Sequence, residues 1–367
     1  MVTERPASRQ GAEVPRWRVL RQWFARDENS LMSAGLVVAV GMALAFAFTN
    51  GVHDAANAIA TLVATRAARP GTAVLLAAAG NVLGPLLLGS AVASTIAGIV
   101  TVPSDQVIPV LGAALTGAVA WNGLTWWRGL PSSSGHALLG GLVGAALAEG
   151  GAGSVEWGGF DGIKPVGVLG VAGVLTIAPA AGLLAGLVVD RALRRAARRS
   201  TRRVRGPVRA GQWLMSEGLA LSHGANDAQK AVGVVALLLV AGGELSHLAA
   251  PIWVELASGA ALTAGTALGG WRIVRTIGRH IIRIRPLDAL SSQTGSTAVL
   301  LGASVIGAPV STTQVVASSV VGVGGGRRRW RHVRWRVVRA ILIAWLVTVP
   351  ATAVFAVVAL VPWRWLT

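Results

Sequence analysis

Two polar stretches interrupt an otherwise apolar chain, and each resembles the other. Residues 50–58 read Asn-Gly-Val-His-Asp-Ala-Ala-Asn-Ala, and residues 222–231 read Ser-His-Gly-Ala-Asn-Asp-Ala-Gln-Lys-Ala. Because a carboxylate inside a bilayer is costly, the aspartates of these stretches, Asp54 and Asp227, are candidates for a functional site. The same costly element appearing twice indicates a duplicated membrane protein whose site lies where the two copies meet.

The composition is that of an integral membrane protein. The chain has 367 residues, of which 53% are hydrophobic and only 13% are charged, whereas soluble domains are roughly 25% charged. Apolar runs of about 20 residues, the length that a helix needs to cross the hydrocarbon core, recur along the chain. We expect ten spans, at about residues 31–65, 71–100, 107–127, 131–149, 163–190, 211–241, 247–271, 288–307, 309–324 and 340–362. The predicted fold class is therefore an all-α, multi-pass protein of the cell membrane.

The net charge of +18 comes from arginines that cluster between the apolar spans. Residues 191–209 carry nine, residues 272–285 carry five and residues 327–339 carry seven. A nucleic-acid-binding surface would interleave such charges with aromatic and polar groups. The tendency of basic loops to stay in the cytoplasm explains the clusters more simply, so we expect no nucleic-acid partner. The absence of cysteine excludes disulfides and thiolate metal sites.

The second half of the chain repeats the first at a nearly fixed offset. Asp54 aligns with Asp227, a shift of 173, and the Pro-Ser-Ser-Ser-Gly-His of residues 131–136 aligns with residues 309–314, a shift of 178. With the arginine clusters in the cytoplasm, each half crosses the membrane five times, so the two halves have opposite orientations. This predicts an inverted-topology repeat, the architecture of many secondary transporters.

The domain boundaries follow from the repeat and the charges. The polar N-terminal tail carries six arginines and is expected outside, against the charge rule, which weighs loosely attached tails less. We expect an Arg-rich tail at residues 1–30, a first repeat at 31–190, an Arg-rich cytoplasmic linker at 191–210 and a second repeat at 211–367.

The two aspartates favour a cation site. A hydrogen-bonded structural role would explain one such residue, but two at matched repeat positions favour function. Gly51 and Gly224 are expected to break their long helices into halves with exposed backbone ends. Carboxylates and freed carbonyls together would bind a cation, and a protonated Asp54 or Asp227 could donate to an anion.

The hydroxyl-rich segments favour an anion site. Ser133 and Ser134 follow a proline at the start of one span, and Ser311, Thr312 and Thr313 follow another. This pattern is typical of a helix N-terminus with hydroxyl caps. Ordinary capping explains one such segment, but two that face each other across a repeat interface could surround an oxyanion with hydroxyl and amide groups.

Together these motifs resemble the signatures of the PiT family of inorganic phosphate transporters, most closely its compact bacterial low-affinity type. The resemblance includes residues 121–126, 270–272 and 292–294 and covers roughly residues 35–362. It implies import of inorganic phosphate coupled to a cation through a central site. Carried over residue by residue, it nominates Asp54, Asn57, Ser133, Ser134, Asp227, Lys230, Ser311, Thr312 and Thr313.

Each candidate residue receives an expected role. Phosphate binding is assigned to Ser133, Ser134, Ser311, Thr312, Thr313, Asn57 and Lys230. Cation coupling is assigned to Asp54, Asp227, Asn226, His53 and Glu217, while a structural polar role is the alternative for His53 and for His223. His223, Gln293 and Thr294 are further candidates. We expect no catalytic residue, no resident metal and no cofactor other than co-transported H⁺ or Na⁺. A divalent metal bound to the phosphate, and a homodimer within the lipid bilayer, are left open.

The chain departs from the family pattern at Gln314, where a His is usual, and at Gly135, which replaces a Ser. These departures put proton handling near Gln314 in question. Two other functions fit parts of the pattern. An intramembrane phosphatase is disfavoured because no partner motif follows Ser134-Gly135-His136. A transporter of another oxyanion, such as sulfate, is disfavoured because an aspartate suits a substrate that carries protons near neutral pH.

Overall fold

The computed structural model describes residues 34–199, 205–268, 281–326 and 330–367. The expected N-terminal tail lies outside the described residues. Within the described ranges the protein is helical apart from one small β-hairpin, in which Gly159 pairs with Val166.

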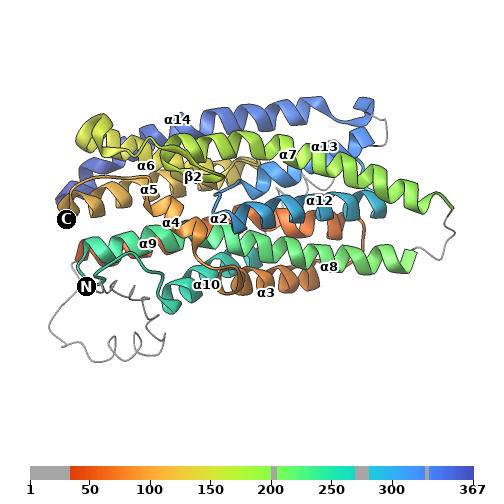
Figure 1. The fold of residues 1–367 in the computed structure, drawn as a ribbon, viewed down its shortest axis with the longest axis horizontal. Coiled ribbons are helices and arrows are strands. Elements are labelled where there is room, and N and C mark those ends of the chain that lie inside the picture. Colours follow the sequence, from red (N-terminus) through yellow and green to blue (C-terminus); the bar gives the residue numbers. More distant parts are fainter. Residues whose placement is uncertain (1–33, 200–204, 269–280, 327–329) are drawn as a thin grey trace, which may run out of the picture. The chain divides into compact units, whose positions relative to one another are not determined.

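Figure 1 colours the chain along the sequence and labels most of its helices. The first half contains α2 (Ala34–Ala64), α3 (Pro70–Leu88), α4 (Ala91–Ala97), α5 (Ser104–Arg128), α6 (Ser134–Gly150), the 3-10 turn η1 (Gly151–Ser154), β1 (Gly159–Asp161), β2 (Lys164–Val166), α7 (Gly167–Ala196) and the 3-10 turn η2 (Ala197–Arg199). The second half contains α8 (Arg205–His223), the π-helical turn η4 (Gly224–Ala228), α9 (Gln229–Ala241), α10 (Ile252–Leu268), α12 (Pro286–Val305), α13 (Thr312–Gly326), the 3-10 turn η6 (Trp330–His332) and α14 (Trp335–Leu366).

The all-α membrane class is confirmed. Among the described residues, seven helical segments are long and apolar enough to cross a bilayer, and α8, η4 and α9 together form one of them. Each of the ten expected spans corresponds to a helix or a helix pair. Three of these helices, α10, α12 and α13, are not among the seven segments, because each falls short in length or in hydropathy, and all three lie in the second half.

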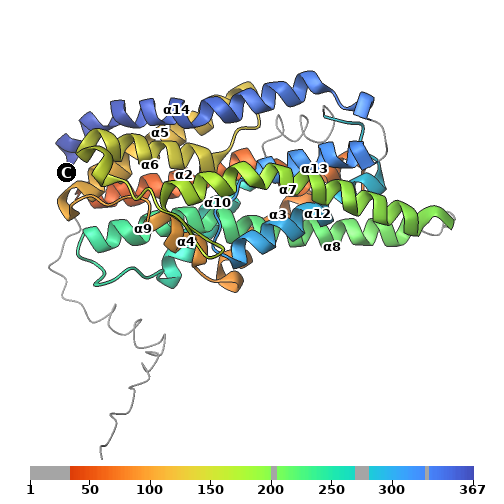
Figure 2. The ribbon, with the colours of Figure 1, turned by 45° about the horizontal axis from the view of Figure 1, so that its top comes forward.

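Each half contributes a helical hairpin that packs against the last helix of the other half (Figures 1 and 2). In the first hairpin, Gly117 of α5 and Gly140 of α6 both lie against Thr352 of α14. The second hairpin consists of α12 and α13, and Gly186 of α7 lies against both of these helices. Glycine allows these helices to approach closely, as is usual in membrane bundles. The reciprocal exchange is the arrangement that two inverted repeats would produce.

The turns of both hairpins lie in the protein interior. Pro131, in the first turn, accepts a hydrogen bond from the indole of Trp345 at 3.0 Å. In the second turn, the Asn226 side chain donates to the Ala308 carbonyl at 2.9 Å and accepts from the Val310 amide at 3.2 Å. Irregular backbone at membrane depth needs such partners because lipid supplies none.

The expected helix break at Gly51 was wrong, whereas the one at Gly224 is present as a local change of helix type. α2 runs unbroken through Gly51, and at Gly224 the α-helix gives way to the π-helical turn η4. Gly51 instead allows α2 to approach α10, because a Cβ atom there would collide with the carbonyl oxygen of Leu262. Close packing, and not a break, explains this glycine.

Candidate functional site

The second-half carboxylate, Asp227, lies in η4 and is fully buried. The Lys230 ammonium donates to its Oδ1 at 2.5 Å and to the Val310 carbonyl at 2.8 Å. The hydroxyl of Thr312, the first residue of α13, donates to Oδ2. A π-helical turn frequently marks a functional site, and here it carries the carboxylate. Asp227 therefore has a fixed cationic partner and one hydroxyl donor.

The first-half carboxylate, Asp54, lies in α2 and accepts hydroxyl hydrogens from both hairpins. Ser134, at the start of α6, donates to Oδ2 at 3.1 Å, and Thr313, near the start of α13, donates to Oδ1. Asn57, one turn later in α2, donates to the Thr313 hydroxyl at 3.1 Å. Since Ser134 and Thr313 come from different halves of the chain, Asp54 lies where the two halves meet.

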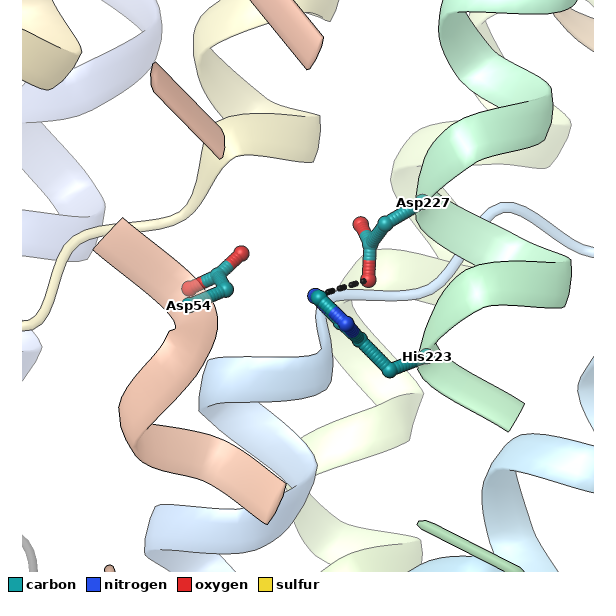
Figure 3. A group of neighbouring side chains, drawn as sticks. All are labelled: Asp54, His223 and Asp227. Carbon is teal, nitrogen blue, oxygen red and sulfur yellow. Dashed lines mark ion pairs between the residues drawn. The ribbon is translucent and has the colours of Figure 1, made fainter. Parts of the chain in front are cut away.

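The two carboxylates and His223 form one buried group. One ligand atom of each residue lies within 4.8 Å of the others. Figure 3 shows the His223 ring reaching into the space between Asp54 and Asp227, with its Nε2 atom 3.4 Å from Asp227. The residue types, two carboxylates and an imidazole, offer lone pairs to a cation.

A second hydrogen-bond network fixes the tautomer of His223. Its Nδ1 atom lies 2.8 Å from Asn81 Oδ1. The Asn81 amide nitrogen donates to Thr266, and the Thr266 hydroxyl in turn donates to the Leu262 carbonyl. This network assigns Asn81 Oδ1 as an acceptor, so neutral His223 carries its hydrogen on Nδ1. Its Nε2 then presents a lone pair toward Asp227, and no described residue donates to it.

His53 is linked to the first hairpin. Its Nδ1 lies 3.3 Å from Asp54, and its Nε2 lies within reach of two hydroxyls, Ser132 at 3.2 Å and Thr125 at 3.3 Å. Thr125 and Ser132 also contact each other at 3.0 Å. His53 therefore connects the carboxylate to the turn between α5 and α6.

The remaining candidates have other placements. Ser133 and Ser311 cap their helices, since their hydroxyl oxygens accept from the backbone amides of His136 at 3.2 Å and Gln314 at 3.4 Å. The side chain of Asn226 bonds to the backbone of the second hairpin turn, and its amide group donates there and not to the carboxylates. Glu217 lies on α8 outside the group formed by the carboxylates and His223.

Three contributors to the site were missed by the sequence-based prediction: Asn81, Thr125 and Ser132. Asn81 is a lone amide in an apolar span, which was a detectable signal, but its contact with His223 joins residues 142 apart. The contacts of Thr125 and Ser132 with His53 depend on the conformation of the turn between α5 and α6. Both sets of contacts, at His223 and at His53, therefore depend on tertiary packing, which the sequence pattern does not show.

Comparison with known proteins found a matching family model and similar relatives. The family model described as the phosphate transporter family matches residues 50–356. A protein of Rhizobium meliloti (strain 1021), named a probable low-affinity inorganic phosphate transporter, is 41% identical over 323 residues, which are 88% of this chain and 94% of that protein. A protein of Bacillus subtilis (strain 168) with the same name is 36% identical over 88% of this chain and 95% of its own length.

The fold also matches a solved structure. That structure is described as "The sodium-dependent phosphate transporter", and it superposes with a TM-score of 0.79 over 90% of this chain and 99% of its own. The sequence identity is 23%, so the likeness supports the architecture of the bundle.

Proposed function

Because this chain belongs to the phosphate transporter family, whose members are multi-pass membrane transporters, we propose that it imports inorganic phosphate by symport with a cation. The observation that supports this proposal is the buried group in which the His223 imidazole lies within 4.8 Å of ligand atoms of both Asp54 and Asp227.

The charges of the buried centre favour coupling. Asp54 and Asp227 each contribute −1 and Lys230 contributes +1, so with neutral histidines the group has a net charge of −1. A bound phosphate dianion would change the net charge of the group from −1 to −3. Repulsion between the phosphate and the carboxylates is strong in such a buried, low-dielectric medium. A bound cation lowers the repulsion, so cation and anion should bind best together. Since Lys230 already pairs with Asp227, Asp54 is the carboxylate that lacks a permanent cationic partner among the described residues.

The hydroxyl groups provide a second reason for coupling. Ser134, Thr312 and Thr313 each donate to a carboxylate. A hydroxyl has a single hydrogen, so it cannot donate to a carboxylate and to phosphate at once. A cation on Asp54 and Asp227 would occupy their lone pairs and free these hydrogens. The hydroxyls at the starts of α6 and α13 could then turn toward a phosphate, which the positive ends of the two helices also attract.

Lys230 and Asn57 occupy related positions with different roles in this scheme. Lys230 neutralises Asp227, whereas Asn57 donates to Thr313 and leaves its own Oδ1 buried without a donor in the described part of the chain. We assign Lys230 to charge compensation first and to phosphate attraction second. Asn57 is assigned to positioning the Thr313 hydroxyl.

Sodium is the first cation to test. The solved structure with the same fold is described as sodium-dependent, and carboxylate and hydroxyl oxygens suit a hard cation. A proton shared between His223 and Asp227 is the alternative, because imidazole is the side-chain group that exchanges protons near neutral pH. Phosphate bound to a divalent metal would present a smaller negative charge to the same centre.

The experiment is uptake of labelled phosphate into proteoliposomes with an imposed Na⁺ or pH gradient. The gradient that drives accumulation identifies the cation, and added Mg²⁺ tests a metal–phosphate substrate. Asp54→Asn and Asp227→Asn should each abolish gradient-driven uptake, whereas excess sulfate should not compete. Wild-type uptake by both variants would contradict the assignment of the carboxylates.

A further inference from the structure

A second positively charged site lies away from the central carboxylates. A cavity of about 430 Å³ opens where the end of α2 and the η2 turn meet the beginnings of α8 and α12. Its lining includes four arginines, Arg66, Arg205, Arg209 and Arg285, and no acidic residue. By the arginine distribution along the chain this end of the bundle faces the cytoplasm. A cavity with this lining is suited to an anion.

Two of these guanidinium groups are available to a ligand. Arg209 donates to the Ala67 carbonyl at 3.0 Å, which fixes its position. Arg66 and Arg205 form no side-chain hydrogen bond or ion pair with any residue in the ranges that the structure describes. Arg66 also has a φ of 58°, which is uncommon for a residue with a side chain. Guanidinium groups in this situation bind phosphoryl oxygens well because their donors match the oxyanion geometry.

A line of polar residues on α2 leads from the central site to this cavity. Asp54, Asn57 and Thr61 are spaced by three and four residues, so they share one face of α2, and Thr65 follows four residues after Thr61, directly beyond the end of the helix. Thr65 lines the cavity. The Asn57 Oδ1 and Thr61 Oγ1 atoms are buried and make no hydrogen bond in the described part of the chain. Buried polar atoms are nearly always paired, so two unpaired ones on one line point to a ligand or water that passes there.

Side chains of α8 and α12 lie against the polar face of α2, and their hydrogen bonds hold the three helices together there. Ser216 of α8 donates to the Ala58 carbonyl of α2 at 2.6 Å, and Gln293 of α12 donates to Ser216 at 3.2 Å. One turn nearer the cavity, Thr65 donates to Gln212 at 2.7 Å. Gln293 Oε1 is another buried atom without a donor among the described residues. The same three helices, α2, α8 and α12, thus form both the junction at Ser216 and the cavity beyond it.

We propose that the arginine-lined cavity is the inner mouth of the transport path, a second phosphate-binding site that receives phosphate from the central site along the polar face of α2. This inference rests on the proposed function, since it takes inorganic phosphate as the substrate. The arginines raise the local concentration of the anion and favour its departure from a centre of net negative charge. Separation of α2, α8 and α12 at Ser216 opens the route between the two sites.

The test is equilibrium dialysis of labelled inorganic phosphate against the full-length protein in phosphatidylcholine nanodiscs, at constant low ionic strength and with the coupling cation present. The wild type should bind two phosphates per chain. Arg66→Gln/Arg205→Gln should weaken one site at least about tenfold, the loss expected from two charged hydrogen bonds. The matched control is Arg336→Gln/Arg339→Gln, which removes the same charge from the first turns of α14, outside the cavity lining. Both sites should remain in this control.

The two proposals fail in distinguishable ways. Asp54→Asn should alter only the cation-dependent site, so an unchanged isotherm there counts against the central site and not against the cavity. Equal phosphate binding by the cavity variant and its control would overturn the cavity site. So would native mass spectra in which phosphatidylglycerol, and not phosphate, occupies the cavity and is lost on Arg66→Gln/Arg205→Gln.

The route is tested by Thr61→Val, which retains both sites but removes a polar step between them. Phosphate exchange across proteoliposomes should be several-fold slower than in Thr49→Val, a control on the same helix whose hydroxyl donates to the Phe46 carbonyl. Equal exchange rates in the two variants would contradict the route along α2.

Discussion

At the scale of single residues, charge compensation inside the bundle decides the behaviour of the site. Lys230 and Asp227 are both fully buried and pair at 2.5 Å. Burying either charge alone is far more costly than burying the pair, because the remaining charge has lost its solvation. The pair therefore has a structural role in addition to its place beside the transport site.

Lys230→Met should lower the free energy of unfolding by about 3–5 kcal/mol, since it leaves Asp227 buried without its cation. The double variant Asp227→Asn/Lys230→Met should be more stable than this single variant. Thermal unfolding in detergent measures both. Arg364→Gln, which removes an exposed partner of Glu149, should cost under about 1 kcal/mol. A double variant that is no more stable than Lys230→Met would contradict the pairing.

Asn81 acts on the site through His223. Its Oδ1 holds the hydrogen on His223 Nδ1 and so directs the Nε2 lone pair toward Asp227. Asn81→Ala should raise the cation concentration needed for half-maximal phosphate uptake by about 10–100-fold, the usual cost of losing such an orienting partner. Asn122→Ala is the control, because the Asn122 amide donates toward Thr49 and not His223. Equal cation dependence in both variants would show that Asn81 does not orient His223 for cation binding.

At the scale of elements, glycine contacts set how closely the helices approach. Gly51 of α2 lies against the α10 backbone, whereas a Cβ atom added at Gly41 of the same helix would meet no atom within 4 Å. Gly51→Ala should destabilise the protein by about 1–3 kcal/mol through overpacking. Gly41→Ala should stabilise it by about 0.5–1 kcal/mol through helix propensity. Unfolding midpoints compare the two, and an equal effect would contradict the close approach of α2 and α10.

The sequence predicted the helices well and their interruptions less well. Each of the ten predicted apolar runs coincides with a helix or a helix pair, and the spacing of Asp227 and Lys230 placed both on one helix face. The continuity of α2 through Gly51 could not be predicted, because a glycine that breaks a helix and one that admits a neighbouring helix look alike in sequence. The depth of the hairpin turns at Pro131 and Pro309 likewise depends on packing against α14 and α7.

At the scale of the whole molecule, the two halves build one site by exchanging hairpins. Asp54 of the first half accepts hydroxyl hydrogens from Ser134 of its own hairpin and Thr313 of the other. A change in the packing of either hairpin therefore alters the same carboxylate. Sequence repetition predicted this meeting of halves, while the particular hydroxyl that reaches each carboxylate became apparent only in the folded structure.

The orientation of the bundle has a direct test, because the chain has no native cysteine. Asp161→Cys lies on the exposed β-hairpin and Arg336→Cys on the exposed start of α14. In intact cells a membrane-impermeant thiol reagent should label the first variant and reach the second only after permeabilisation. The reverse pattern would invert the topology and place the arginine-lined cavity outside.

The central claim is that a cation on the buried carboxylates releases hydroxyl hydrogens to phosphate, so that each ion promotes binding of the other. Isothermal titration of the wild type with phosphate, at fixed ionic strength and increasing coupling-cation concentration, tests it most directly. Phosphate affinity at the central site should rise with the cation, and cation affinity should rise by the same factor with phosphate. Asp54→Asn should remove this linkage. A phosphate affinity that stays constant across Na⁺ concentration and pH would contradict the claim.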